Sequence, residues 1–242
     1  MAIRVLVNGA AGKTGQAACR AIEGDDEVEL AGRGGRGDRL GDLIRRLRPD
    51  VVLDLTEAAA AFANAAAIIE SGARPVIGTS GLVQGEVEEL QRRCAEQGVG
   101  GVIAPNFSLS AVLMMKFARE AAAYFGRVEI VEAHHDHKKD TPSGTALRTA
   151  EMVAETWEPA AALESEETVA GARGAVYRGV PLHAVRLPGR LAQQEVMFGG
   201  PGEVLTLKSE VVDREAFGPG ILLACKKAMQ AEGLAYGLEN LL

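Results

Sequence analysis

The segment from residue 128 to residue 146 holds the densest group of side chains suited to acid–base chemistry. It contains three of the four histidines of the chain, His134, His135 and His137, and two lysines follow directly. An imidazole is the side chain whose unperturbed pKa lies nearest neutrality, so it can give or take a proton. The segment therefore predicts a histidine acid or base among cations.

The same segment predicts a strand, a loop and a helix start. Residues 128–133 are rich in β-branched residues, which favour a strand. Thr141 or Ser143 can cap the following helix, and Pro142 is tolerated in a first turn. Backbone N–H groups at a helix start bind anions. A carboxylate or phosphate beside the lysines is therefore the expected ligand.

Two other interpretations of this segment stay open. The histidines with Asp136 and Asp140 could bind a metal ion, because His and Asp are common ligands. The positive charge of Lys138 and Lys139 disfavours this, since it repels a cation, and we expect no metal. The segment could also be a solvated polar loop, as most charge runs are.

Composition limits the class of protein to which the chain belongs. Its 242 residues fit one large or two small domains, and 47% of them are apolar. No apolar run approaches the roughly 20 residues of a membrane span, and no signal-peptide pattern precedes the first strand. The net charge of −7 disfavours nucleic acid as a partner. Cys19, Cys94 and Cys225 are far apart and odd in number, which is typical of reduced thiols in a cytoplasmic protein.

The N-terminal residues predict a dinucleotide-binding turn. A strand over residues 3–8 and a helix over residues 16–23 flank the run Gly9-Ala10-Ala11-Gly12-Lys13-Thr14-Gly15. Strand, glycine turn and helix is the order that the fingerprint requires, although one alanine breaks its G-x-G-x-x-G spacing. A mononucleotide P-loop is the alternative, but it needs a glycine where Val7 stands.

The second predicted strand, residues 28–31, bears on the choice of cofactor. No carboxylate stands at its tip, where an acid usually bonds the ribose hydroxyls of NAD; Arg33 and Arg36 stand there instead. A guanidinium matches a 2′-phosphate in charge and geometry, so the sequence favours NADPH. A flexible basic loop is the alternative.

Further strands over residues 51–56, 74–77 and 101–104 alternate with helices, as in an open parallel sheet. Ligands of such sheets lie at the carboxyl ends of the strands. The residues expected there, besides those of the glycine turn, are Asp54–Thr56, Gly78, Thr79, Ser80, Ala104, Pro105, Asn106 and Phe107.

The pattern then changes. After a helix over residues 146–157, strands with short turns predict an antiparallel, partly open sheet, at residues 174–180, 183–187, 195–198 and 203–209. A final helix over residues 221–230 is expected to return to the first domain.

Taken together, these motifs resemble the dihydrodipicolinate reductase family, also called 4-hydroxy-tetrahydrodipicolinate reductase, of the diaminopimelate and lysine pathway. The main match is Glu132-Ala133-His134-His135-x-His137-Lys138-x-Asp140-x-Pro142-Ser143-Gly144-Thr145-Ala146. The flanking matches are the glycine turn, Asp54-x-Thr56, Val76-Ile77-Gly78-Thr79, Asn106-Phe107-Ser108 and Phe198-Gly199 before Gly202-Glu203.

The resemblance implies roles for particular residues. His134 is the implied acid/base histidine and Lys138 the implied proton donor, and which of them delivers the proton stays open. His135, Gly144 and Thr145 are the implied binders of the carboxylates of a dicarboxylate substrate. The implied contacts of NADH or NADPH are the glycine turn, Gly78 to Ser80 and Ala104 to Phe107.

The resemblance also implies an architecture. It consists of an α/β Rossmann-like dinucleotide-binding domain at residues 1–107 and 214–242, and an α+β substrate-binding and tetramerisation domain with an open mixed sheet at residues 108–213. The family implies a cytoplasmic homotetramer.

The chain departs from the family pattern at three places. Lys13-Thr14 stands where Arg-Met is frequent, Asp136 where a basic residue is common, and Gly35 where an acid is often found, with Arg36 retained. Two other functions stay open: a non-catalytic NADPH-sensing protein, and another small-acid dehydrogenase such as aspartate dehydrogenase. The pair of His134 and Lys138 disfavours a sensor, which needs neither.

Overall fold

The computed structural model describes residues 2–79, 81–161 and 166–242. The chain forms two compact units: Met1–Leu109 with Arg214–Leu242, and Ser110–Asp213. The predicted roles of the two parts, dinucleotide binding and substrate binding with oligomerisation, stay predictions. Among the described helices, none has the length and apolar character that a membrane crossing demands.

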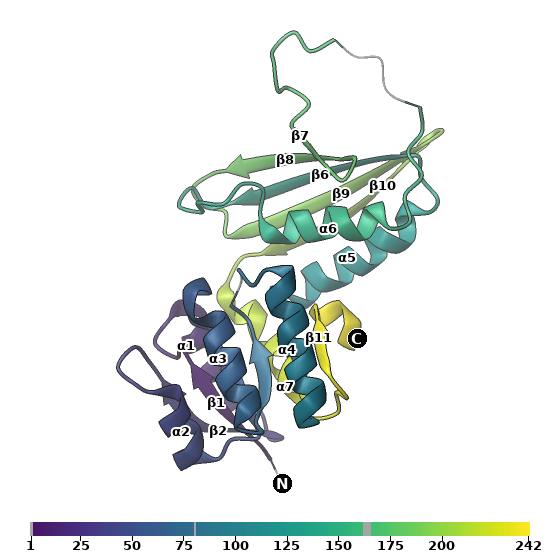
Figure 1. Ribbon diagram of the computed structural model, residues 1–242. Coiled ribbons are helices and arrows are strands. Elements are labelled where there is room, and N and C mark those ends of the chain that lie inside the picture. Colours follow the sequence, from purple (N-terminus) through teal and green to yellow (C-terminus); the bar gives the residue numbers. More distant parts are fainter. Residues whose placement is uncertain (1, 80, 162–165) are drawn as a thin grey trace. The chain divides into compact units, whose positions relative to one another are not determined.

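The first unit is built on sheet A, whose paired strands all run parallel in the order β11-β5-β4-β3-β1-β2 (Figure 1). Its strands are β1 (Ile3–Asn8), β2 (Val28–Gly34), β3 (Val51–Asp54), β4 (Arg74–Ile77), β5 (Gly101–Ile103) and β11 (Leu234–Tyr236). All four residues of β3 are buried, as expected for a parallel strand covered on both faces. The predicted Rossmann-like class is confirmed.

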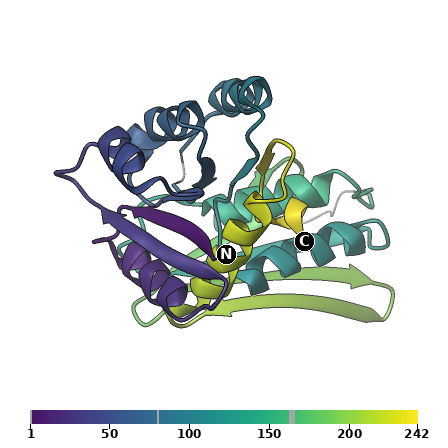
Figure 2. The same ribbon diagram turned by 90° about the horizontal axis from the view of Figure 1, so that it is seen from below.

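Helices cover both faces of sheet A. They are α1 (Lys13–Glu23), α2 (Leu40–Leu47), α3 (Ala58–Glu70), α4 (Gln84–Gln97) and α7 (Gly218–Ala228), with the short 3-10 helices η1 (Arg214–Phe217) and η2 (Leu238–Leu241). Figure 2 shows α1 and α7 on one side of the sheet and α2, α3 and α4 on the other. The predicted return of the last helix to this unit is confirmed, because α7 packs against α1.

The second unit is built on sheet B, in the order β10-β9-β6-β8-β7. Its strands are β6 (Arg127–His134), β7 (Ala175–Tyr177), β8 (Val180–Arg186), β9 (Ala192–Gly200) and β10 (Glu203–Val211). The pairs among the later strands, β7 with β8 and β9 with β10, are antiparallel as predicted, and β6 lies between β8 and β9 and runs parallel to β8. The crossover through α6 (Gly144–Ala154) makes this possible, because parallel neighbours need a long connection. The sheet is therefore mixed, as the fold class requires.

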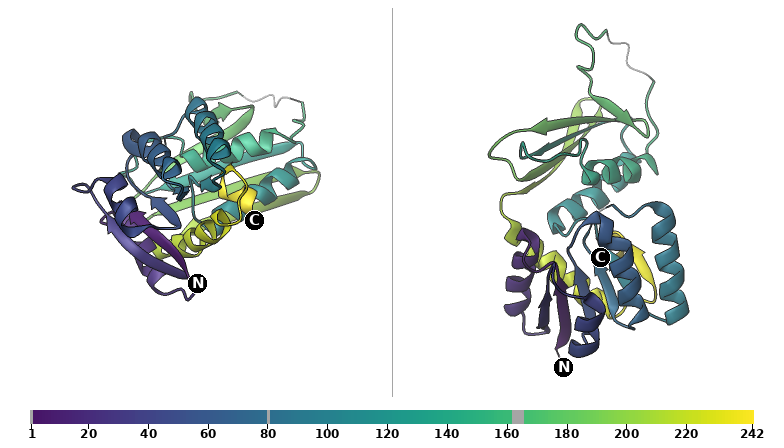
Figure 3. Two further views of the ribbon diagram at one scale, coloured as in Figure 1. Left: turned by 60° about the horizontal axis from the view of Figure 1, so that its bottom comes forward. Right: turned by 60° about the vertical axis from the view of Figure 1, so that its left-hand side comes forward.

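One face of sheet B carries α5 (Leu109–Ala122) and α6 (Figures 1 and 3). Side chains alternate along β6, so Val128, Ile130 and Glu132 are buried on one face. The register places Val176, Val185 and Val204 on the opposite face, where they are 70%, 41% and 72% exposed. These three valines are named from the part of the chain that the structure describes.

Candidate active site

The turn between β1 and α1 needs glycine at two positions. Gly9 has a φ of +84°, and a Cβ there would lie 2.5 Å from the carbonyl oxygen of Leu55. A Cβ on Gly15 would lie 2.2 Å from the carbonyl oxygen of Gly9. The turn after β1 therefore packs directly on the turn after β3, and only glycine permits that approach.

The start of α1 is open to an anion. Gly12 is its N-cap, no side chain caps the helix, and the first turn holds no acidic residue. The first N–H groups of a helix have no intrahelical partner. Lys13 and Thr14 open this helix, so amides and a cation are available for a pyrophosphate.

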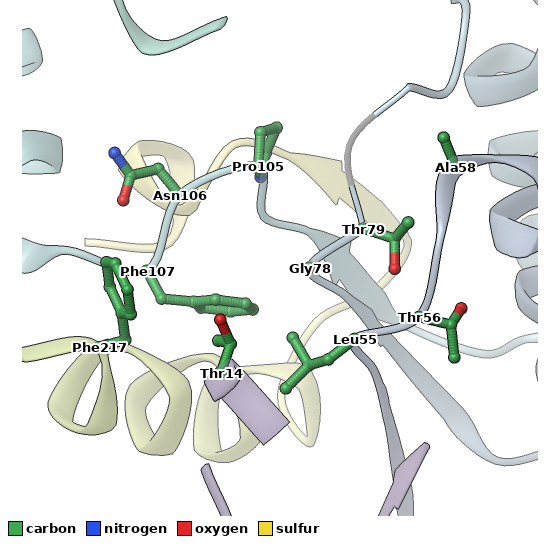
Figure 4. A pocket seen from close by; sticks show the side chains of 10 residues that line it. All are labelled: Thr14, Leu55, Thr56, Ala58, Gly78, Thr79, Pro105, Asn106, Phe107 and Phe217. Carbon is green, nitrogen blue, oxygen red and sulfur yellow. The ribbon is translucent and has the colours of Figure 1, made fainter. Parts of the chain in front are cut away.

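A pocket of about 280 Å³ lies at the carboxyl ends of the strands of sheet A (Figure 4). Six of the predicted cofactor residues line it: Thr14, Gly78, Thr79, Pro105, Asn106 and Phe107. Gly9 to Gly12 lie on the turn before α1, and Lys13 is the first residue of that helix. Ala104 is fully buried, and Arg36 is exposed beyond β2. The predicted Ser80 lies outside the described residues.

Leu55 and Thr56, which were expected at this edge because they follow a buried strand, also line the pocket, and so do Ala58 and Phe217, which the sequence did not assign to the site. Phe217 comes from η1, and a Cβ on the nearby Gly220 would lie 2.0 Å from the carbonyl oxygen of Phe107. No local pattern marks that contact between distant segments.

A buried carboxylate connects the strand ends beneath this pocket. Asp54 is fully buried and accepts hydrogen bonds from Asn8 at 2.7 Å, Thr56 at 2.9 Å, Asn64 at 3.0 Å and Thr79 at 3.1 Å. Burial raises the pKa of Asp54, and these hydrogen bonds offset the rise only in part. The carboxylate thus ties the ends of β1, β3 and β4 together.

The two arginines near the end of β2 differ in their surroundings. Strand β2 extends to Gly34, so Arg33 belongs to the strand, and its guanidinium pairs with Glu23 of α1 at 2.5 Å. Arg36 is exposed and has no ion pair with any residue that the structure describes. Only Arg36 is therefore available to an incoming anion at this tip.

The histidine segment has the predicted strand, loop and helix start. β6 ends at His134, Ser143 is the N-cap of α6, and its hydroxyl accepts the N–H of Ala146 at 3.2 Å. Of the two predicted caps, Ser143 is therefore the one used. Pro142 was expected in the first turn of the helix, but it precedes the cap. Its peptide bond to Thr141 is cis.

Glu132 is the centre of the polar contacts at the end of β6. Its carboxylate is fully buried. It accepts hydrogen bonds from Nδ1 of His134 at 2.6 Å, from both terminal nitrogens of Arg186 at 2.9 Å and from the N–H of Ser143 at 3.1 Å. Burial raises the pKa of Glu132, but the hydrogen bonds from His134 and Arg186 outweigh it and leave the pKa below its ordinary value. The group is thus an ionised, buried acceptor.

Lys138 lies in the loop that follows. Its ammonium donates to Asp140 at 2.8 Å, and its backbone N–H donates to the carbonyl of His135 at 3.1 Å. Burial raises the pKa of Asp140, but the hydrogen bond and charge of Lys138 outweigh this effect and leave the pKa below its ordinary value. His137 is 88% exposed. Within the described ranges, His, Cys, Asp and Glu side chains form no group of three or more that could hold a metal ion.

The start of α6 is open at Gly144. A Cβ at this exposed residue would meet no atom within 4 Å, and its φ is not positive. The packing of the described residues therefore does not demand glycine here. Thr145 follows in the same first turn, so two of the predicted substrate-binding residues present their backbone at this helix start.

A parallel sheet with an open helix start at its ligand edge, joined to a mixed-sheet unit with a buried carboxylate–histidine pair, defines a two-part nicotinamide-dependent oxidoreductase. The comparisons with known proteins make this specific. Residues 3–107 match the family model described as "Dihydrodipicolinate reductase, N-terminus", and residues 110–242 match the one described as "Dihydrodipicolinate reductase, C-terminus". The chain therefore belongs to the dihydrodipicolinate reductase family, and the predicted resemblance is confirmed.

Individual relatives agree with this. The chain is 48% identical to the 4-hydroxy-tetrahydrodipicolinate reductase of Legionella pneumophila (strain Corby), over 100% of both chains. It is 49% identical to that of Moorella thermoacetica, over 99% of this chain and 98% of the relative. Among solved structures, the dipicolinate-bound dihydrodipicolinate reductase of Paenisporosarcina sp. TG-14 is 38% identical with a TM-score of 0.90, over 100% of both chains.

Proposed function

We propose that the chain reduces 4-hydroxy-tetrahydrodipicolinate, by way of dihydrodipicolinate, to tetrahydrodipicolinate with a reduced nicotinamide dinucleotide. The observation that carries this proposal is the end of β6, where His134 is fixed by a buried carboxylate ten residues before the open start of α6 at Gly144. Family membership supports the reaction. The dipicolinate in the relative from Paenisporosarcina sp. TG-14 is a planar diacid, which supports a dicarboxylate substrate.

Each group in the second unit has a task in this proposal. The N–H groups of Gly144 and Thr145 bind one carboxylate at the helix start. His135 assists in holding the substrate through its second carboxylate or ring. Lys138 or His134 gives a proton to the nitrogen or conjugated carbon on which negative charge develops, a contribution of about 10²–10⁴-fold. Because Asp140 accepts a hydrogen bond from Lys138, the amine of Lys138 is held in place before the substrate arrives.

The dinucleotide fits the first unit. Gly9 and Gly15 allow the close turn, α1 starts without an acid, and the pocket contains the predicted Gly78, Thr79 and Phe107. When bound, the reduced nicotinamide supplies the hydride. The exposed guanidinium of Arg36 supports a preference for NADPH, since it matches a 2′-phosphate, with NADH as the second cofactor.

A homotetramer in the cytoplasm completes the proposal. The exposed valines on the face of sheet B opposite α6 support self-association of the second unit, because apolar side chains gathered on one face favour an interface. Cys19, Cys94 and Cys225 are all unpaired and buried, which supports a reducing compartment.

The direct test is an assay with the condensation product of pyruvate and aspartate semialdehyde. We expect oxidation of the reduced cofactor that depends on this product, with a higher kcat/KM for NADPH than for NADH. Absence of turnover with both cofactors would overturn the proposed reaction, whereas equal kcat/KM values would overturn only the cofactor preference.

A further inference from the structure

We infer that Glu132 and Arg186 are the positioning residues of His134, and that they assign the proton exchange to its Nε2 atom. This inference rests on the proposed reaction and deepens it. The resemblance gave a role to His134 but none to Glu132 or Arg186.

The first step is the tautomer of the imidazole. Glu132 and His134 are two residues apart on β6, so they lie on the same face of the strand. Oε2 of Glu132 lies 2.6 Å from Nδ1 of His134. An ionised carboxylate has no hydrogen to donate, so Nδ1 carries the hydrogen of this bond. Nε2 is then the ring nitrogen that takes up and releases a proton, as in other carboxylate-oriented histidines.

The second step is the charge of the carboxylate. The Glu132 side chain is 1% exposed, and an isolated buried carboxylate takes up a proton to avoid the cost of desolvation. The two parallel hydrogen bonds from Arg186, both 2.9 Å, hold it ionised. Without Arg186, a protonated Glu132 could itself donate to His134 and stabilise the other tautomer.

The third step is the position of the loop. Arg186 also donates to the carbonyl oxygen of Asp140 at 2.7 Å, and Asp140 holds Lys138. Leu187, the residue after β8, donates its backbone N–H to the carbonyl of His134 at 2.9 Å. The guanidinium of Arg186 thus fixes the imidazole of His134 through Glu132. It also fixes Asp140, which holds the ammonium of Lys138.

Among the described residues, a few charged or polar groups contact this cluster. β8 contributes Arg186, the loop contributes Asp140 with Lys138, and α6 contributes the N–H of Ser143. Loss of the negative charge of Glu132 alone should therefore make the charged imidazole of His134 less stable. An activity that needs this imidazolium would then decline at lower pH.

The test compares kcat/KM across pH for the full-length protein and for Glu132→Gln, which keeps the shape and removes the charge. For Glu132→Gln we expect a roughly 10- to 1000-fold loss in kcat, with the KM for the dinucleotide unchanged. The alkaline limb of its pH profile, where activity falls as the pH rises, should lie about one to three pH units lower. Glu132→Asp, which restores the charge, should return part of the activity and of the limb. Arg186→Lys should reduce kcat in the same way as Glu132→Gln.

A matched control lies on the opposite face of the same strand. Glu129 accepts Nε2 of His183 at 2.7 Å and also pairs with Arg173, so it repeats the carboxylate–histidine–arginine set. Glu129→Gln should leave the pH profile unchanged, and light scattering on each variant detects any change in assembly.

A double variant separates positioning from a merely structural role. In a His134→Gln background, Glu132→Gln should cause no further loss, because the group that it positions is already absent. Losses that multiply, or an alkaline limb that does not move, would overturn the inference. Nitrogen NMR of His134 gives a readout independent of turnover: a hydrogen on Nε2 and none on Nδ1 in the neutral ring would also overturn it. If the pathway substrate is not turned over at all, the proposed function fails while this NMR result still tests the tautomer.

Discussion

Replacing Gly144 by alanine should make the protein more stable and a worse enzyme. A Cβ at this position meets no atom within 4 Å, and the backbone is not in the left-handed region, so alanine fits without strain. The substitution reduces the conformational entropy of the unfolded chain and should stabilise the fold by about 0.4–1 kcal/mol. If the N–H groups at this helix start bind a carboxylate, however, the added methyl group occupies the space through which that carboxylate approaches.

The magnitude follows from the bond that is lost. A hydrogen bond to a charged group contributes about 1.5–3 kcal/mol, and about 1.4 kcal/mol corresponds to a factor of ten. Displacing the carboxylate from one amide should therefore raise the KM for the dicarboxylate roughly 10- to 100-fold. Steady-state kinetics with varied substrate at saturating NADPH measures this, and chemical denaturation measures the stability.

Gly85→Ala is the matched control. Gly85 is the second residue of α4, it is exposed, and a Cβ there also meets nothing within 4 Å. Both variants should gain similar stability, but only Gly144→Ala should change the KM. If the two variants bind the substrate equally well, the start of α6 does not hold a carboxylate and the reasoning fails.

Four further outcomes are expected. His134→Gln should lower kcat about 10²–10⁴-fold with an unchanged circular dichroism spectrum; a loss below tenfold would contradict its role as acid or base. Arg36→Ala should raise the KM for NADPH far more than that for NADH, and equal effects on the two KM values would contradict the proposed contact between Arg36 and the 2′-phosphate. Folding lowers the pKa of Glu132, so its contribution to stability is present above its ordinary pKa of 4.5 and is lost as the pH falls through the lower folded value. In urea titrations, the free energy of unfolding of Glu132→Gln should therefore fall less steeply at acid pH than that of the unsubstituted protein, and parallel curves would refute this. Burial raises the pKa of Cys225 to about 12, so a thiol reagent should modify it only after unfolding, and rapid labelling of the native protein would contradict that burial.

Most of the fold could be predicted because its signals are local. Strand, glycine turn and helix identify β1 and α1, and the apolar run of β3 identifies a central parallel strand. β11 was not predicted, since Leu234–Tyr236 is a three-residue strand whose neighbour on the sheet, β5, lies far away in the sequence. The pairing of β6 with β8 was also missed, because a pattern of alternating residues does not state which strand is the neighbour.

The site divides in the same way. His134, Ser143 and Gly144 were found because a strand end, a loop and a helix start are contiguous in the sequence. The pocket residue Phe217 and the arginine partner of Glu132, Arg186, come from distant elements and have no local mark. A side chain becomes a partner only when the chain returns to the same place in space.

The contiguity of the histidine segment has a physical reason that also explains its one distant member. A strand end places an imidazole, a loop places an ammonium, and a helix start places backbone N–H groups, so neighbouring residues supply three kinds of polar group from three kinds of backbone. Such a segment carries a buried carboxylate, Glu132, and the proposed acid–base role requires its partner, His134, to exchange a proton. A permanent cation is needed, and only arginine remains charged at any working pH. Arg186 must therefore come from the adjacent strand β8, where the parallel register places it beside His134.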